Sequence, residues 1–258
     1  MIANITIEEI DYKIDLSDPI DISIPINPDP NLNVNAWYID PPKFKTVELD
    51  GWVGSTSRGG DVNFNSITFN PHSHCTHTET VGHILTGDYS VNHALKTYFY
   101  LSELISVYPK HIGGDFIITK AEIQSKICNP NIKSLIIRTL PNNESKKNKN
   151  YSHSNPPYLE EDAAIYLREI GIDHLLIDLP SVDKEKDDGA LLCHNAFWNT
   201  YGEVRVSATI TEFIYVDDLI NIIILSLVKI NTTGSDCDFI KHKDMISMYL
   251  FPYYFHLF

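Results

Sequence analysis

The sequence predicts an α/β protein with a mixed sheet, and three stretches in the middle of the chain carry this prediction. SLIIRT (134–139) and IDHLLIDLP (172–180) are short apolar runs of the kind that form buried strands. Between them, YLEEDAAIYLREIG (158–171) has acids in its first turn, apolar residues at helical spacing and Gly171 placed to end a helix. Strand, helix and strand in this order are typical of a βαβ unit with parallel pairing.

Local signals predict further elements on both sides of this unit. In the stretch ITKAEIQSKI, Thr119 and Glu122 form a capping box that predicts the start of another helix. The polar segment NNESKKNKNYSHSNPP (142–157) ends in two prolines and predicts an exposed loop. The alternation in VSATITEFIYV (206–216) predicts a strand with one polar face, on which we expect Glu212.

The composition is that of a globular chain, and we expect a single domain over residues 1–258. The 258 residues are 43% hydrophobic and 21% charged, which excludes a disordered protein. The formal net charge is -14 and the sequence pI is about 5.1. A surface of this sign repels phosphate backbones, so nucleic acid is not an expected partner.

The cysteines and the chain start favour a cytoplasmic protein. The four cysteines contain no CxxC pair and are too few for a disulfide scaffold, which favours a reducing compartment. The acidic start MIANITIEEIDYKIDLSD lacks the features of a signal peptide. The most apolar run, LINIIILSLVKI (219–230), has about half the length that crosses a bilayer. We therefore expect it to form a buried strand and expect no contact with a membrane.

The stretch FNPHSHCTHTETVGHI (69–84) contains four of the 11 histidines of the chain. Side chains two positions apart lie on one face of an extended segment, so His77 and Glu79 can converge on one ion. Imidazole and carboxylate ligands suit zinc, and also manganese or iron, and this mixed set is typical of sites that keep a position open for water. The alternative is a polar loop whose histidines bind nothing. The remaining candidate ligands in this stretch are His72, His74, Cys75 and His83.

A second histidine and glutamate pair lies downstream, at His194 and Glu212, with Glu203 between them in a predicted loop. Each glutamate, taken alone, is better explained as a solvent-exposed side chain. His194 lies between LLC and AFW, where burial of an unpaired polar side chain would be costly.

Four ordered motifs resemble the cyclase-like family, which includes bacterial kynurenine formamidases and isatin hydrolases. The stretch CTHTETVGH (75–83) resembles the family signature HxGTHxDxPxH. The other three are IDLSDPIDISIP (14–25), LLIDLPSVD (175–183), and HNAFW followed by TITEFIYV. The resemblance covers residues 14–216, and it fades after Asp218, so 219–258 is a divergent C-terminal segment.

The resemblance implies a swivelling β/β/α domain and assigns roles by position. His77 and Glu79 would bind a divalent metal, zinc or manganese, as one or two ions. His83 would be the catalytic proton shuttle. His194 and Glu212 would complete the metal site.

The sequence departs from the family signature at several positions. Ser73 stands where the first histidine ligand belongs, so a shift of one residue would bring His72 or His74 to the metal, and we favour His72. Glu79 replaces an aspartate. Further departures are Cys75 for glycine, Val81 for proline and an inserted loop over 201–205.

The implied activity is hydrolysis of a C–N amide bond in a small molecule, either a formamide such as N-formylkynurenine or a cyclic amide, by metal-activated water. A lactone or other cyclic ester is an alternative substrate of the same family, and a metal-binding protein without catalysis is an alternative of another class. Trp37, Phe64 and Trp198 are candidates for substrate contact, although aromatic residues more often pack cores. Ser181 and Asp183 could support the site or simply form a turn. The resemblance also implies a homo-oligomer, a dimer or a tetramer.

Overall fold

A computed structural model describes residues 1–7, 9–220, 223–227, 237–239 and 250–253. Its centre is a mixed β-sheet with the strand order β16–β7–β14–β13–β11–β8–β15–β17. Strands β8, β11, β13 and β14 are mutually parallel, and β7 runs antiparallel to β14. The predicted α/β class with a mixed sheet is therefore confirmed. The strands are β7 (His77–Glu79), β8 (Phe99–Val107), β11 (Ser134–Thr139), β13 (His174–Ile177), β14 (Thr209–Glu212), β15 (Ile223–Leu227), β16 (Cys237–Phe239) and β17 (Leu250–Tyr253).

The remaining elements are short helices and small sheets at the edges of this centre. The α-helices are α1 (Pro71–His74), α2 (Val91–Ala94), α3 (Lys120–Gln124), α4 (Glu161–Glu169) and α5 (Leu192–Trp198). The 3-10 helices are η1 (Pro30–Leu32), η2 (Thr56–Arg58), η3 (Val81–His83) and η4 (Glu144–Asn148). The other strands are β1 (Ile2–Ile7), β2 (Ile10–Asp15), β3 (Lys43–Thr46), β4 (Glu48–Leu49), β5 (Trp52–Val53), β6 (Asn65–Thr68), β9 (Lys110–Ile112), β10 (Asp115–Ile118) and β12 (Tyr158–Leu159).

The predicted βαβ unit is β11–α4–β13, and its two strands pair in parallel. The helix is shorter than predicted, because Tyr158 and Leu159 pair with β10 as the strand β12 instead of joining α4. Gly171 follows the helix with φ of +83°, a left-handed conformation that glycine adopts without strain. The other predicted helix start is also present, since the Thr119 hydroxyl accepts a hydrogen bond from the backbone N–H of Glu122.

The two faces of the sheet are covered by different parts of the chain. On one face, Leu135 and Ile137 of β11 lie in a large core with residues of α4 and α5. On the other face, Ile136 of β11 and Leu176 of β13 pack with α2 and with the chain near Ile22. Both faces of these parallel strands are therefore buried, which explains their nearly continuous apolar sequence.

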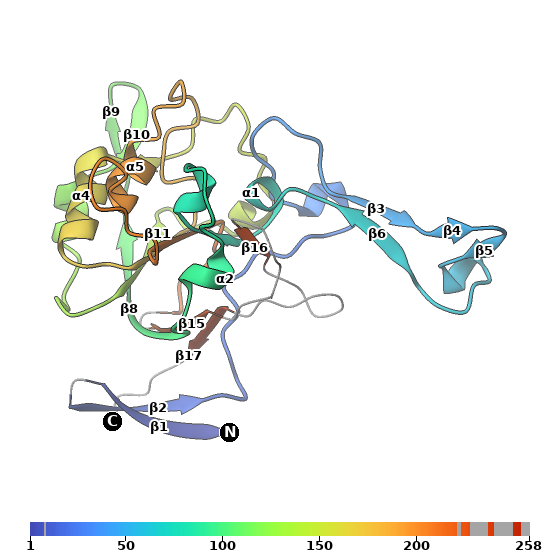
Figure 1. Ribbon diagram of the computed structural model, residues 1–258, viewed down its shortest axis with the longest axis horizontal. Helices are drawn as coiled ribbons and strands as arrows, with labels where there is room; N and C mark the ends of the chain where they lie inside the picture. Colours follow the sequence, from blue (N-terminus) through green and yellow to red (C-terminus); the bar gives the residue numbers. More distant parts are fainter. Residues whose placement is uncertain (8, 221–222, 228–236, 240–249, 254–258) are drawn as a thin grey trace.

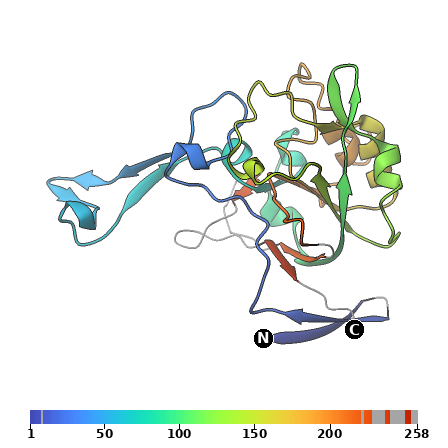
Figure 2. The ribbon, with the colours of Figure 1, turned by 180° about the vertical axis from the view of Figure 1, so that it is seen from behind.

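Two β-hairpins extend away from the sheet and its helices (Figures 1 and 2). One is formed by β1 and β2 at the start of the chain. The other is a long arm in which β3 pairs with β6, and its tip carries β4, β5 and η2. The arm leads directly into α1, so its base lies next to the histidine-rich stretch.

Several predicted segments differ in detail from the structure. The strand predicted over 206–216 is limited to β14, and both of its faces are buried. Glu212 shares its face with Ile210, opposite to Thr209 and Thr211, so its expected place on the polar face is wrong. The segment 142–157 is mostly exposed but contains the buried Tyr151.

The predicted strand over 219–230 is present as β15, between Ile223 and Leu227. The rest of that stretch after Ile220 lies outside the described residues, as does most of 241–258. Within the latter segment, β17 pairs with β15. Across the parts of the chain that the structure describes, no helix has the length and apolar character needed to cross a lipid bilayer.

Candidate metal centre

The candidate metal centre is built on the pairing of β7 with β14. This antiparallel register places His77 directly opposite Glu212, and the distance from His77 Nε2 to Glu212 Oε2 is 3.4 Å. Glu79 lies two residues after His77 and therefore on the same face of β7. All three side chains are buried, with at most 4% of the side chain exposed. The β7–β14 pair thus holds one imidazole and two carboxylates close together.

The backbone around His77 fixes which of its ring nitrogens faces the centre. Nδ1 of His77 lies 3.0 Å from the carbonyl oxygen of Cys75, which can only accept a hydrogen bond, so Nδ1 carries the proton. Nε2 is then a lone-pair donor directed at the carboxylates. Burial lowers the pKa of His77 to about 4, so its imidazole is neutral at pH 7.

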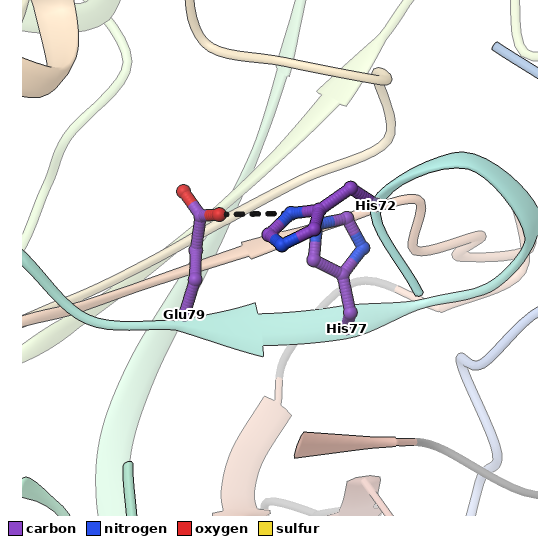
Figure 3. Close-up of side chains that lie close together, drawn as sticks. All are labelled: His72, His77 and Glu79. Atoms are coloured by element: carbon purple, nitrogen blue, oxygen red, sulfur yellow. Dashed lines mark ion pairs between the residues drawn. The ribbon is translucent and has the colours of Figure 1, made fainter. Parts of the chain in front are cut away.

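His72 and His74 occupy different sides of the one-turn helix α1. The ring of His72 stacks edge-on against His77, and its Nδ1 lies 3.3 Å from Glu79 Oε2 (Figure 3). The ring of His74 instead accepts a hydrogen bond at Nδ1 from the backbone N–H of Asn70, at 2.9 Å. Of the two candidates for the ligand position at Ser73, the structure brings His72 to Glu79 and directs His74 into the chain around Asn70.

His194 reaches the centre from α5 and is oriented by Asp183. The Asp183 carboxylate accepts from the backbone N–H of Cys193 and lies 2.5 Å from Nδ1 of His194. It therefore caps the first turn of α5 and holds the imidazole in one orientation. Nε2 of His194 is directed at Oε1 of Glu79, at 3.0 Å. Ser181 accepts from the backbone N–H of Asp183, which is the turn role considered for it.

The charges of the cluster are strongly coupled. Burial acts to raise the pKa of Glu79, but the nearby imidazoles of His194 and His72 hold it well below its usual value. Burial and the Glu79 carboxylate raise the pKa of Glu212 well above its usual value. Burial opposes protonation of His194, yet Asp183 and Glu79 raise its pKa well above the usual value. His194 therefore holds a proton between two carboxylates, and a cation would compete with that proton for Nε2.

His83 lies at the outer edge of the cluster, on η3. Its ring is 4.4 Å from that of His72, and its Nδ1 is 3.5 Å from Glu79 Oε2. Of the centre's histidines it is the most exposed, with 30% of its side chain accessible. Burial lowers its pKa to about 4. His83 is thus a neutral base at pH 7 placed between the buried cluster and solvent.

The arrangement has the chemistry of a divalent cation site. Potential ligand atoms of His72, His77 and Glu79 lie within 4.8 Å of one another, and so do those of Glu79, His83 and His194. Nε2 of His77 and Oε2 of Glu79 are buried and make no hydrogen bond of good geometry within the described chain. Buried lone pairs are costly unless paired, and a cation between them would pair both. Nitrogen and carboxylate donors fit zinc, manganese or iron.

The three aromatic candidates for substrate contact have different surroundings. Trp37 is half-buried, and its indole N–H donates to the backbone carbonyl of His72 at 2.9 Å. Trp198 is fully buried beside the ring of His194, and its N–H donates to the carbonyl of Ala208. Phe64 is exposed on the hairpin arm, where its ring contacts that of Trp52. Glu203, by contrast, lies exposed in its loop.

Two contacts in the structure carry no signal in the sequence. One is the hydrogen bond between Trp37 and His72, because a lone tryptophan in a loop matches no motif. The other is the ion pair between Lys146 of the polar segment 142–157 and Asp178, with 2.7 Å between Nζ and Oδ2. The composition of that segment predicts exposed lysines, and only the fold reveals that one of them is paired with a buried carboxylate at the end of β13.

Comparison with known proteins identifies relatives of this chain at the level of sequence family and fold. A family model described as "Putative cyclase" matches residues 14–184. No curated protein matches the chain.

Solved structures share the fold over most of the chain, at sequence identities that establish the fold alone. A structure described as a potential metal-dependent hydrolase with cyclase activity has a TM-score of 0.59 and 14% identity, covering 92% of this chain and 97% of its own. A predicted metal-dependent hydrolase from Bacillus stearothermophilus has a TM-score of 0.57 and 15% identity, with coverages of 92% and 98%. Isatin hydrolase A from Labrenzia aggregata has a TM-score of 0.60 and 12% identity, with coverages of 86% and 90%.

Proposed function

The chain belongs to the cyclase family, and we propose on that premise that it is a metal-dependent hydrolase that cleaves a C–N amide bond of a small molecule. The observation that carries the proposal is the convergence of buried imidazole and carboxylate ligand atoms, of which Nε2 of His77 and Oε2 of Glu79 make no hydrogen bond of good geometry within the described chain. A purely structural cluster would be expected to satisfy these atoms internally. Similar solved structures, which include proteins described as metal-dependent hydrolases and isatin hydrolases, support the same proposal.

We assign the ligands from their geometry. His72, His77 and Glu79 form one group of ligand atoms, and His194 and Glu212 close the other side of the centre. Zinc is the preferred cation and manganese the second. When bound there, a divalent cation supplies an acidified water nucleophile and a Lewis acid for a carbonyl oxygen. Asp183 keeps Nε2 of His194 aimed at Glu79, and the Cys75 carbonyl keeps Nε2 of His77 aimed at Glu212.

His83 is assigned the proton-transfer role. Its partial exposure lets it contact both the buried carboxylate Glu79 and a substrate entering from solvent. As a neutral imidazole it can accept a proton from the nucleophilic water and then donate that proton to the departing nitrogen. Proton transfer to that nitrogen is needed because an amide anion is a poor leaving group.

The substrate class that we propose is a formamide or cyclic amide attached to an aromatic ring. N-formylkynurenine represents the open-chain type and isatin represents the cyclic type. Because sites and not folds decide substrate choice, the two types are compared directly in the test.

The test is turnover by the purified chain supplied with Zn²⁺ or Mn²⁺, measured against N-formylkynurenine, isatin and a simple lactone. We expect hydrolysis of at least one amide, and about 100-fold or greater loss of kcat in His83→Ala with bound metal unchanged. His93→Ala is the matched control, because His93 is an exposed histidine on α2. Metal binding without turnover of any amide would reject the proposed activity, and turnover of the lactone alone would reassign it to ester hydrolysis.

A further inference from the structure

Two loops, one of which contacts the metal centre through Trp37, contain four residues with a strained backbone. Trp37 and Tyr38 have φ of 60° and 63°, and His153 and Asn155 have φ of 62° and 45°. All four are non-glycine residues in the left-handed region, where the Cβ atom crowds the backbone. Such conformations persist only when surrounding contacts enforce them, and they concentrate at functional sites.

The carboxylate of Glu185 connects the two strained loops. It accepts from the hydroxyl of Tyr38 at 2.7 Å, from the backbone N–H of Asn155 at 2.8 Å, and from the backbone N–H of His153. The rings of Tyr38 and His153 also contact each other, with 4.5 Å between centroids. A third link is the hydrogen bond from the Tyr38 backbone N–H to the hydroxyl of Ser152, at 3.0 Å. One half-buried carboxylate thus binds three donors from two separate loops.

The side chain of Trp37 connects the first of these loops to the metal centre. Its indole N–H donates to the carbonyl oxygen of His72 at 2.9 Å. Its ring packs on the cluster that contains Tyr151 and Phe213, and Phe213 in turn lies beside His77 with 6.2 Å between ring centroids. Since α1 is a single turn of four residues, contacts from outside the helix matter for its orientation.

We propose that Trp37 is a positioning residue for the metal centre, and that Glu185, through Tyr38, holds the backbone conformation that aims the Trp37 indole at the His72 carbonyl. The inference rests on the metal centre of the proposed function but not on any hydrolytic activity. Fixing the His72 backbone places its imidazole beside Glu79, and so pre-organises a ligand before the cation arrives.

The test measures binding of Co²⁺ to the metal-depleted full chain, from the visible absorption of the bound ion, in parallel with thermal unfolding. Trp37→Phe keeps an aromatic ring and removes the N–H. We expect its affinity for Co²⁺ to fall about 10-fold, the effect of one lost hydrogen bond on a ligand. Trp52→Phe makes the same chemical change on the hairpin arm, away from the centre, and we expect it to bind Co²⁺ as the wild type does.

Two further variants test the link through Glu185. Tyr38→Phe removes one donor to the carboxylate, and Glu185→Gln leaves one acceptor oxygen for three donors; each should weaken Co²⁺ binding about 3-fold. These changes lie in half-buried or exposed positions, so they decide the matter if Trp37→Phe does not fold.

The inference is overturned if Trp37→Phe binds Co²⁺ as tightly as Trp52→Phe does, or, where Trp37→Phe does not fold, if Tyr38→Phe and Glu185→Gln both bind as the wild type does. Absence of Co²⁺ binding to the wild-type chain would overturn it together with the metal centre. If the wild type binds Co²⁺ but hydrolyses no amide, the proposed activity fails and a weaker Trp37→Phe site still supports the positioning role.

Discussion

At the scale of single residues, the two histidines of α1 lie two positions apart and have different partners. His72 directs Nδ1 toward Glu79, while His74 directs Nδ1 toward the backbone N–H of Asn70. Burial lowers the pKa of His74, so the buried ring is held in its neutral form. The resemblance places Ser73, which lies between them, at the position of the family's first histidine, and its neighbour His72 lies within 3.3 Å of the carboxylate.

This difference gives a prediction for metal binding. His72→Ala removes a proposed ligand nitrogen, and we expect metal affinity to fall by at least about 100-fold, more than typical losses from supporting residues. His74→Ala should retain metal affinity and instead lower the free energy of unfolding by about 1–3 kcal/mol, because it empties a buried site. Isothermal titration with Zn²⁺ together with denaturant unfolding separates the two effects. Equal losses of affinity in both variants would contradict the assignment of His72.

The buried histidine His174 in β13 leads to a prediction of how the free energy of unfolding depends on pH. It is buried against Tyr100, with 3.9 Å between ring centroids, and bonded to the Thr209 hydroxyl at 2.8 Å. Burial lowers its pKa from 6.5 to about 4, with Asp173 opposing and Arg205 assisting the shift. The unfolded chain therefore binds the proton at a higher pH than the folded chain does. Its contribution to stability is fully present above about pH 6.5 and is lost as the pH falls toward 4.

The expected size of this effect is about 2 kcal/mol in the free energy of unfolding between pH 7 and pH 5. His174→Gln keeps a hydrogen-bonding side chain that does not titrate. Between pH 7 and pH 5, the free energy of unfolding of this variant should therefore fall by about 2 kcal/mol less than that of the wild type. Other buried histidines titrate in both proteins, and comparison in the same metal state cancels their contribution. Parallel pH profiles for the wild type and the variant would show that His174 is not the group responsible.

At the scale of elements, the polar segment 142–157 shows that composition predicts the exposure of a loop better than its contacts with the rest of the fold. Its lysines and asparagines are typical of a solvated loop, and most of them are exposed. Lys146, however, lies in η4 with only 12% of its side chain exposed, and its ammonium group contacts Asp178 and the Thr139 hydroxyl. Burial raises the pKa of Asp178, and Lys146 opposes that rise. The ion pair fixes the segment across the ends of β11 and β13.

Removing the lysine should therefore be costly. Lys146→Met leaves the Asp178 carboxylate buried without its counter-charge, and we expect a loss of about 3 kcal/mol in the free energy of unfolding. The neighbouring variant Lys147→Met is a matched control; Lys147 pairs with an exposed glutamate, and its loss should cost no more than about 1 kcal/mol. Adding Asp178→Asn to Lys146→Met should recover part of the loss, because no buried charge remains. Equal effects of the two lysine variants would argue against a buried pair.

The elements that the sequence predicts well are those whose signal is local. The strands β11 and β13 and the helix α4 can be predicted because burial requires apolar side chains within each element. This requirement leaves an apolar run in a strand and a periodic pattern in a helix. The predicted start of α4 is too early, because Tyr158 and Leu159 pair with β10. This strand lies about forty residues earlier in the chain, so no local sequence pattern indicates the pairing. The arm from β3 to β6 is likewise held by pairing between segments that carry no strong strand signal.

At the scale of the whole molecule, the candidate site depends on pairings between distant segments. His77 and Glu79 are predictable as neighbours because they alternate along one strand. Their partners come from 115 residues away for His194 and 135 residues away for Glu212, through α5 and the β7–β14 register. The sequence alone connects these residues with His77 and Glu79 only through the family motifs, since spacing along the chain says nothing about a register across the sheet. The supporting bond from Trp37 belongs to no motif and becomes visible only in three dimensions.

The same long-range construction predicts that a bound cation stabilises the whole fold. The centre joins α1, β7, α5 and β14, so an ion that binds only the folded chain connects segments from both halves of the sequence. At a Zn²⁺ concentration of about 100 times Kd, the stabilisation is about 2.7 kcal/mol, or a rise of about 5–10 °C in Tm for a chain of this size. A chelator should reverse the rise. Glu79→Gln should abolish most of it, because Glu79 belongs to both groups of ligand atoms. If Zn²⁺ raises the Tm of that variant as much as that of the wild type, the ion binds elsewhere on the protein.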